Sequence, residues 1–286
     1  MRRLLALTLL LGLGLAQIGR PVEAFQKALG PLPPGARVEV ESKNGRLLAA
    51  TYLGPENASF LARFLERGTG LAFGPGFLDW YGKNWEALRG KALTLNLGED
   101  FLLELRLQDP FRARLLPRSV PKSALGQDRL VLGGKGPFLR VFSDFQCPYC
   151  QRLAREVLPA LKGRALKGEL RISYRHLPLT EIHPQALPAA QASECAHEQG
   201  AFWPYHDLLM AGRLGDYLGL ARALGLEEEA FTRCLQSPEV RKRVEEERAL
   251  ALRLGLRGTP TVFAGPYKVP NPFDLTQVLD YLELAR

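Results

Sequence analysis

Cys147 and Cys150 lie on either side of a Pro-Tyr dipeptide, where a predicted strand gives way to a predicted helix. The apolar run Phe138–Phe145 predicts the strand, and Pro148–Lys162 predicts the helix. A helix N-terminus offers unpaired N–H groups and the positive end of the helix dipole, and both stabilise a thiolate at Cys147. Cys150 is one turn further on, close enough to attack a disulfide formed at Cys147. The pattern predicts thiol–disulfide exchange, with Cys147 as the nucleophile and Cys150 as the resolving thiol.

Two other uses of a cysteine pair fit the sequence less well. Half of a zinc site has the same spacing, but it needs two further Cys or His ligands, and Cys195 and Cys234 are far apart in predicted helices. A Cys–His protease needs a histidine beside its nucleophile, and nothing in the sequence brings one to Cys147. We therefore expect no metal and no cofactor, and we assign the histidines to the core or the surface. These histidines are His176, His183, His197 and His206.

A second motif, Gly258-Thr259-Pro260-Thr261, precedes the short apolar strand expected at Thr261–Ala264. A cis bond between Thr259 and Pro260 would turn the backbone of residue 259 toward the sulfurs, where it could pair with an extended substrate. An ordinary trans proline at the start of a strand is the alternative. Asp144 and Gln146, beside the cysteine pair, either tune its pKa and fit substrate or are simply the end of the strand and a solvated neighbour.

The chain divides into two regions with different patterns. The first, residues 17–117, predicts a small α+β domain, has no Cys or His, and contains no catalytic constellation. Its expected elements are an amphipathic stretch at Val22–Leu29, a hairpin of Arg37–Ser42 and Arg46–Leu53, helices at Ala58–Glu66 and Phe77–Leu88, and a hairpin of Ala92–Leu97 and Phe101–Leu107. We interpret residues 118–126 as a linker.

The second region, residues 127–286, alternates strands and helices and predicts an α/β plan. Beyond the elements already named, we expect a strand at Glu169–Tyr174 and a final helix at Asp274–Leu284. Between these lies a block of helices, expected at Pro184–Glu198, Phe202–Ala211, Tyr217–Leu224 and Glu227–Leu254 with a break near Pro238.

Several motifs of this second region occur in an order and spacing that resemble the DsbA-like thioredoxin family. They are Phe142–Cys150 with Gln151-Arg152-Leu153, Tyr174–Leu179, His183–Leu187, Gln199–Trp203 and Gly258–Thr261. The resemblance implies a thioredoxin fold with a helical insertion at about residues 184–255. It also implies that Cys147 is the nucleophile, Cys150 the resolving thiol and Pro260 a cis-proline beside them. The Pro-Tyr dipeptide is shared with glutaredoxins, but a glutaredoxin lacks the long insertion.

Cys195 and Cys234 both fall in the insertion. They could form a second redox pair or a structural disulfide. We favour the structural disulfide, because neither cysteine lies beside Pro or Gly at a helix start and because some DsbA-like relatives are similar in carrying a second bridge. The expected pairing is therefore Cys147 with Cys150 and Cys195 with Cys234.

The N-terminus is typical of a signal peptide. Arg2 and Arg3 precede the apolar stretch Leu4–Leu15, and cleavage after Ala16 is expected. An uncleaved anchor is the alternative. Residues 1–16 therefore predict export to the periplasm or another extracytoplasmic space, where disulfides persist. The formal charge of +8 is scattered rather than clustered with aromatics, which argues against nucleic-acid binding.

These observations favour dithiol–disulfide exchange on exported protein substrates. The expected direction is oxidation, with reoxidation by a membrane partner of DsbB or vitamin K epoxide reductase type. The alternatives are a disulfide isomerase or reductase, in which the first region would serve as a dimerisation domain like that of DsbC/DsbG-type isomerases, and a holdase-like binding module. No motif in the first region identifies its role.

Overall fold

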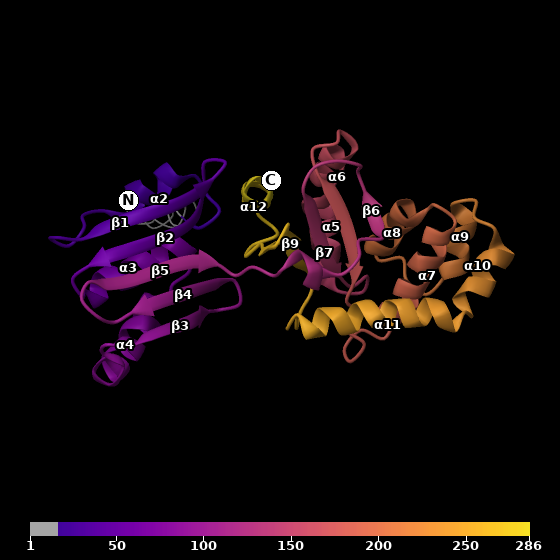
Figure 1. Ribbon diagram of the computed structural model, residues 1–286. Helices are drawn as coiled ribbons and strands as arrows, with labels where there is room; N and C mark the ends of the chain where they lie inside the picture. Colours follow the sequence, from indigo (N-terminus) through magenta and orange to yellow (C-terminus); the bar gives the residue numbers. More distant parts are fainter. Residues whose placement is uncertain (1–16) are drawn as a thin grey trace, which may run out of the picture. The chain divides into compact units, whose positions relative to one another are not determined.

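A computed structural model describes residues 17–286, so the expected signal peptide lies outside the described residues. The described chain forms two compact units (Figure 1). The first holds the residues through Ser119 together with Leu279–Leu284 and Arg286. The second holds Val120–Val278 and Ala285. Within residues 17–286, no helix is both long enough and apolar enough to cross a membrane.

The first unit is built on a five-stranded antiparallel sheet in the order β1-β2-β5-β4-β3, with three helices on one face (Figure 1). The strands are β1 (Arg37–Lys43), β2 (Arg46–Gly54), β3 (Ala92–Leu97), β4 (Phe101–Arg106) and β5 (Phe111–Pro117). The helices are α2 (Val22–Leu29), α3 (Ala58–Thr69) and α4 (Gly74–Leu88). Asn44 and Gly45 both have positive φ, which suits the tight turn between β1 and β2.

Two features of the first unit differ from the sequence analysis. Strand β5 was not assigned there, although its residues alternate between buried and half-buried along its whole length. It pairs with both β2 and β4 and therefore joins the two expected hairpins into one sheet. Helix α4 begins at Gly74 rather than Phe77, because Pro75 suits the first turn of a helix, where its missing N–H has no intrahelical partner.

The second unit has a mixed sheet in the order β10-β9-β7-β8-β6, in which only β7 and β8 run parallel. The strands are β6 (Leu130–Leu132), β7 (Phe138–Ser143), β8 (Arg171–His176), β9 (Thr261–Ala264) and β10 (Tyr267–Lys268). The short 3-10 helix η1 (Lys122–Leu125) precedes β6. The remaining helices are α5 (Pro148–Glu156), α6 (Leu158–Leu166), α7 (Ala186–Glu198), α8 (Phe202–Met210), α9 (Tyr217–Ala223), α10 (Glu228–Leu235), α11 (Pro238–Arg253) and α12 (Leu275–Ala285).

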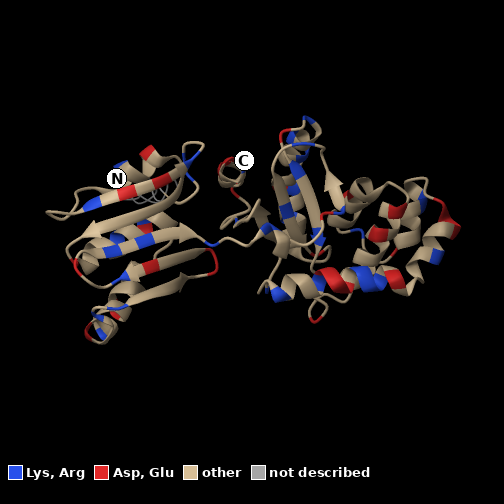
Figure 2. Ribbon diagram, viewed as in Figure 1, with Lys and Arg blue, Asp and Glu red and all other residues tan. Residues whose placement is uncertain are grey.

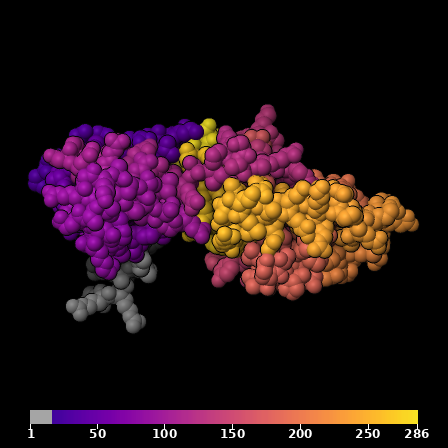
Figure 3. Space-filling view, turned by 60° about the horizontal axis from the view of Figure 1, so that its bottom comes forward, coloured from indigo at the N-terminus to yellow at the C-terminus, as the bar shows by residue number. Residues whose placement is uncertain are grey.

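Helices α7–α11 form an insertion between β8 and β9, so the expected fold class is confirmed: an α/β unit with a helical insertion follows a small α+β unit. In the space-filling view, the gold stretch of α11 runs along the surface of the second unit (Figure 3). Its exposed face carries both signs of charge (Figure 2), including an Arg241–Glu245 ion pair one turn apart. This polar face is what a helix that borders solvent requires.

Two boundaries and one strand in the second unit differ from the sequence analysis. The single helix expected at Pro148–Lys162 is two helices, divided at Val157, because Pro159 has no N–H and its ring would clash with the carbonyl of Arg155 in a continuous helix. Strand β7 ends at Ser143, because the next residue, Asp144, begins a turn. Strand β6 lies at the start of the second region, where the sequence analysis assigned no element.

Candidate functional site

The two cysteines lie at the carboxyl end of β7, the central strand of the second sheet. Cys147 is the N-cap residue of α5, and Pro148 occupies the first helical position. Both thiols are free, and the two residues are 3% and 1% exposed, respectively. Tyr149 between them is 61% exposed. The helix start therefore buries the two cysteines and presents the two residues between them, Pro148 and Tyr149, to solvent.

The pKa values of the two thiols are shifted in opposite directions. A hydrogen bond from the Cys150 thiol, together with the backbone N–H groups of Cys150 and Tyr149, lowers the pKa of Cys147 to about 5, against the opposing effect of burial. Burial raises the pKa of Cys150 well above its ordinary value, and the neighbouring Cys147 sulfur raises it further. At neutral pH the pair therefore consists of a thiolate at Cys147 and a thiol at Cys150.

The Thr259-Pro260 segment lies beside the first sulfur. Strand β9 pairs with β7 so that Thr261 is opposite Phe142, which brings the preceding residues to the same end of the sheet as the cysteines. The Thr259–Pro260 bond is cis. The Sγ of Cys147 is 3.5 Å from the carbonyl oxygen of Thr259, to which its thiol can donate a hydrogen bond. The structure thus brings Cys147, Cys150 and Thr259 together.

Asp144 is 1% exposed and connects the cysteine turn to the loop after β8. Its Oδ1 accepts a hydrogen bond from the backbone N–H of Gln146 at 2.7 Å. Its Oδ2 accepts from the backbone N–H of Leu179 at 2.9 Å and lies 2.8 Å from Nδ1 of His183. The parallel pairing of Ser143 with His176 explains this proximity, because it places the carboxyl ends of β7 and β8 side by side.

Gln146 makes a second connection between the same turn and the same loop. Its Oε1 accepts a hydrogen bond from the backbone N–H of Gln185 at 2.6 Å. The sequence analysis named Asp144 and Gln146 but missed their partners, His183 and Gln185. The His183–Leu187 motif was the available signal, but its contact with a residue 39 positions earlier depends on the pairing of β7 with β8.

Two other histidines are fully buried and lie in side-chain networks. Nε2 of His176 is 3.2 Å from the carboxylate of Glu194, which also pairs with Arg129 at 2.6 Å. Burial opposes ionisation of Glu194, but these partners together lower its pKa to about 2. His206 packs against Phe145 and Tyr174, and burial lowers its pKa. The fourth histidine, His197, packs edge-on against Phe202.

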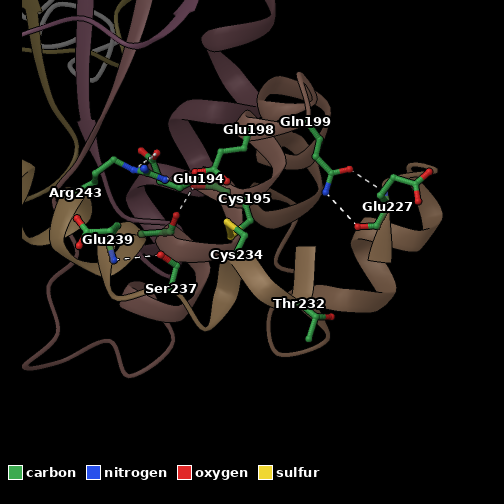
Figure 4. The surroundings of a disulfide bond; sticks show 12 residues. Glu194, Cys195, Glu198, Gln199, Glu227, Thr232, Cys234, Ser237, Glu239 and Arg243 are labelled. Carbon is green, nitrogen blue, oxygen red and sulfur yellow. Dashed lines mark hydrogen bonds and ion pairs between the residues drawn. A yellow bond between two sulfur atoms is a disulfide. The ribbon is translucent and has the colours of Figure 1, made fainter. Parts of the chain in front are cut away.

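Cys195 of α7 and Cys234 of α10 form a disulfide inside the insertion (Figure 4). The same two helices are also tied at their ends, where the side chain of Gln199 bonds both backbone groups of Glu227 (Figure 4). Within residues 17–286, no group of three or more His, Cys, Asp or Glu side chains is arranged to hold a metal ion.

A family model described as thioredoxin matches residues 137–283. A thioredoxin-like oxidoreductase from Silicibacter pomeroyi DSS-3 is 30% identical, with a TM-score of 0.51 over 58% of this chain and 98% of that chain. Oxidised BdbD from Bacillus subtilis is 20% identical, with a TM-score of 0.50 over 56% of this chain and 96% of that one, and so shares the fold.

Among curated proteins, the chain is similar to proteins named Na(+)/H(+) antiporter NhaA. The NhaA 1 protein of Salinispora arenicola is 40% identical over 129 residues, which are 43% of this chain and 19% of that protein. The NhaA 3 protein of Salinispora tropica is 36% identical over 138 residues, 47% of this chain and 21% of that protein. The similarity therefore spans about a fifth of these relatives' own length.

Proposed function

Because the chain belongs to the thioredoxin family and is similar to a thioredoxin-like oxidoreductase, we propose that it is a DsbA-like thiol–disulfide oxidoreductase in which Cys147 and Cys150 exchange disulfides with cysteine-containing protein substrates. The observation that carries this proposal is the pair of opposite acidities, with the pKa of Cys147 lowered to about 5 and that of Cys150 raised. A thiolate attacks or leaves readily, and a neighbouring protonated thiol waits to resolve the mixed disulfide. Thr259 and Pro260 form the proposed substrate-binding edge beside them.

The proposed chemistry in the oxidising direction has two steps. A substrate thiolate attacks the sulfur of Cys147 in the enzyme disulfide, the Cys147–Cys150 bond breaks, and Cys150 leaves with the electron pair and takes up a proton. A second substrate thiolate then attacks the mixed disulfide at the substrate sulfur, and Cys147 leaves as a thiolate. The substrate loses two electrons and gains a disulfide, and the enzyme becomes a dithiol.

We propose oxidation as the physiological direction. A pKa of about 5 at Cys147 stabilises the reduced enzyme at neutral pH, and a stabilised dithiol makes the corresponding disulfide a stronger oxidant. Substrates would be exported proteins in the periplasm or another extracytoplasmic space, reached through the signal peptide expected at residues 1–16. A membrane redox partner of DsbB or vitamin K epoxide reductase type would restore the disulfide.

Equilibration of the protein in glutathione buffers of known poise tests the direction. We expect a potential closer to the ~−120 mV of DsbA than to the ~−270 mV of thioredoxin, and oxidation of a reduced, disulfide-dependent substrate. A potential near the thioredoxin value would overturn the oxidase proposal. The Cys147→Ser variant should lose exchange activity. If instead the wild-type protein binds unfolded protein substrates but exchanges no disulfides with them, the holdase alternative would be favoured.

A second candidate, a dimeric isomerase or reductase, is favoured by the edge strand β3. A second copy paired antiparallel about Leu95 would place Leu93 opposite Leu97 and Thr94 opposite Asn96, with no charge in the pairing. A cavity of about 370 Å³, lined in part by aromatic side chains of α4, borders this strand. The other edge strand, β1, carries alternating charges that discourage such pairing.

Sedimentation equilibrium of the full chain decides between the two candidates. A dimer that becomes monomeric in the Thr94→Lys/Asn96→Lys double variant, in which lysines would face each other, would support the second candidate. If the wild-type protein is a monomer, the second candidate is excluded and the oxidase proposal remains. In either case we propose residues 17–117 and 127–286 as the two domains by chain order, joined by a linker at 118–126, although Leu279–Leu284 group with the first unit.

A further inference from the structure

We propose that Asp144, fixed in place by His183, is the positioning residue for the resolving thiol Cys150. This inference rests on the proposed function, because it assigns a role in the step that Cys150 performs. The backbone N–H of Asp144 donates a hydrogen bond to the Sγ of Cys150 at 3.5 Å. Cys150 is buried and its pKa is raised, so forming a thiolate at its sulfur costs free energy. A fixed N–H dipole that points at the sulfur reduces this cost.

The side chain of Asp144 determines where that N–H points. Both carboxylate oxygens are used: Oδ1 by the N–H of Gln146, and Oδ2 by the N–H of Leu179 and by Nδ1 of His183. A buried carboxylate is tolerated only when such donors satisfy it. Because Nδ1 faces a carboxylate, it must carry the proton, which makes His183 a donor. The backbone of residue 144 is therefore held from one side by its own turn and from the other by the loop after β8.

The first sulfur depends on different groups. The lowered pKa of Cys147 comes chiefly from the Cys150 thiol, with help from Thr259 and from the N–H groups of Cys150 and Tyr149. Loosening Asp144 should therefore slow reactions in which Cys150 attacks or leaves, and should alter the attack by Cys147 much less. This split between the two sulfurs distinguishes a positioning role from a general loss of structure, which would affect both.

Reaction of the reduced protein with the aromatic disulfide dithiobis(nitrobenzoate) separates the two steps in one trace. In the first phase Cys147 attacks the reagent, and one thionitrobenzoate leaves with the electron pair. In the second phase Cys150 loses its proton to water and attacks the Cys147 sulfur, the mixed disulfide breaks, and a second thionitrobenzoate leaves. The reagent gains two electrons, and the cysteines become a disulfide.

We expect Asp144→Asn to slow the second phase by about tenfold, the effect of a lost or misdirected hydrogen bond to a charged group, and to change the first phase by less than about twofold. In this variant the NH₂ group of the asparagine would face the N–H of Gln146 or Leu179, and two donors cannot form a hydrogen bond. His183→Leu should slow the second phase less, and His183→Asn should restore it, because the asparagine amide nitrogen lies near the position of Nδ1. Folding of each variant is checked by its melting temperature in the oxidised state.

Arg248→Met is the matched control. Arg248 of α11 bonds the same loop through the carbonyl of Pro178 and the carboxylate of Glu181. Neither of these hydrogen bonds involves Asp144. Both phases should match the wild-type protein. Equal slowing in Arg248→Met, or an unchanged second phase in Asp144→Asn, would overturn the positioning role. A wild-type trace without a second phase would instead overturn the proposed function itself, so the two failures are distinguishable.

Discussion

At the scale of single residues, the site depends on an unequal division of charge between two neighbouring sulfurs. Cys147 is the N-cap of α5 and receives hydrogen bonds from the Cys150 thiol and from nearby backbone N–H groups. Cys150 is deeper and keeps its proton. The largest contribution to the low pKa of Cys147 is the Cys150 thiol, which the Cys-x-x-Cys pattern itself supplies, so this pattern alone can predict Cys147 as the nucleophile. The largest contribution to the raised pKa of Cys150 is burial, which depends on the surrounding fold.

The pH dependence of alkylation tests this inequality. The rate at which iodoacetamide modifies the reduced protein follows the thiolate population, so we expect Cys147 to reach half of its maximal rate near pH 5, well below the ~8.5 of a free thiol. Cys150 should be labelled more slowly. In the Cys150→Ala variant the midpoint should rise, because the largest contribution to the low pKa is removed. A midpoint near ~8.5 in the wild-type protein would contradict the assignment.

At the scale of elements, a buried charge cluster ties β8 to two helices of the insertion. Glu194 of α7 is fully buried between His176 and Arg129, and Glu247 of α11 accepts hydrogen bonds from Arg175 and from the backbone N–H of His176. Each carboxylate is satisfied by partners on another element. Removal of one partner would leave the remaining charges buried and uncompensated. The cluster should therefore contribute strongly to the stability with which the insertion packs on the sheet.

Substitution Glu194→Gln tests the cluster. At neutral pH we expect the free energy of unfolding to fall by about 3 kcal/mol. The folded-state pKa of Glu194 is lowered to about 2, so the carboxylate stabilises the fold fully above its unfolded pKa of about 4.3 and loses that effect as the pH falls through about 2. The difference in free energy of unfolding between the wild-type protein and Glu194→Gln should therefore narrow toward pH 2.

Denaturant unfolding of the oxidised proteins at several pH values measures this gap. Glu198→Gln is the matched control on the same helix: its half-exposed pair with Arg243 should contribute less than about 1 kcal/mol. A gap that stays constant from neutral pH down to pH 2 would show that charge on Glu194 is not the source of the stability.

The disulfide between α7 and α10 gives a second prediction at this scale. It closes a loop with a sequence separation of 39, and in the chain-entropy model such a bridge stabilises by up to about 4 kcal/mol. The Cys195→Ala/Cys234→Ala variant should melt at a lower temperature and keep its exchange activity per folded molecule. Loss of exchange with unchanged melting would mean that the bridge takes part in electron transfer.

The elements that the sequence predicted well are those whose pattern is complete within a few residues. The hairpin of β1 and β2 is marked by alternation and by Asn44-Gly45, and β9 by a short apolar run. The break at Val157 was missed, because the apolar spacing continues through Pro159 although the backbone cannot. The contact between Asp144 and His183 joins residues 39 positions apart, and only the parallel pairing of β7 with β8 determines it.

At the scale of the whole molecule, chain order and spatial grouping differ. We expected the final helix to belong entirely to the second region, but Leu279–Leu284 groups with the first unit. There the Asp280 carboxylate pairs with Arg20 at 3.0 Å and with Arg46 at 2.6 Å. Tyr281 is fully buried, and its ring lies so near Gly19 that a Cβ there would come within 2.2 Å of it. The first unit is therefore completed by residues that are distant in sequence.

Substitution Asp280→Ala tests this completion. Asp280 is 4% exposed and is shared by two arginines, so its removal should destabilise the first unit by about 3 kcal/mol. Glu283→Ala is the matched control one turn away, because Asn44 bonds only the backbone carbonyl of Glu283. Hydrogen exchange should show lost protection in β1 and β2 for Asp280→Ala alone, with β7 and β8 unchanged. Equal protection of β1 and β2 in the two variants would mean that the first unit folds without this segment and that the domain limits follow chain order after all.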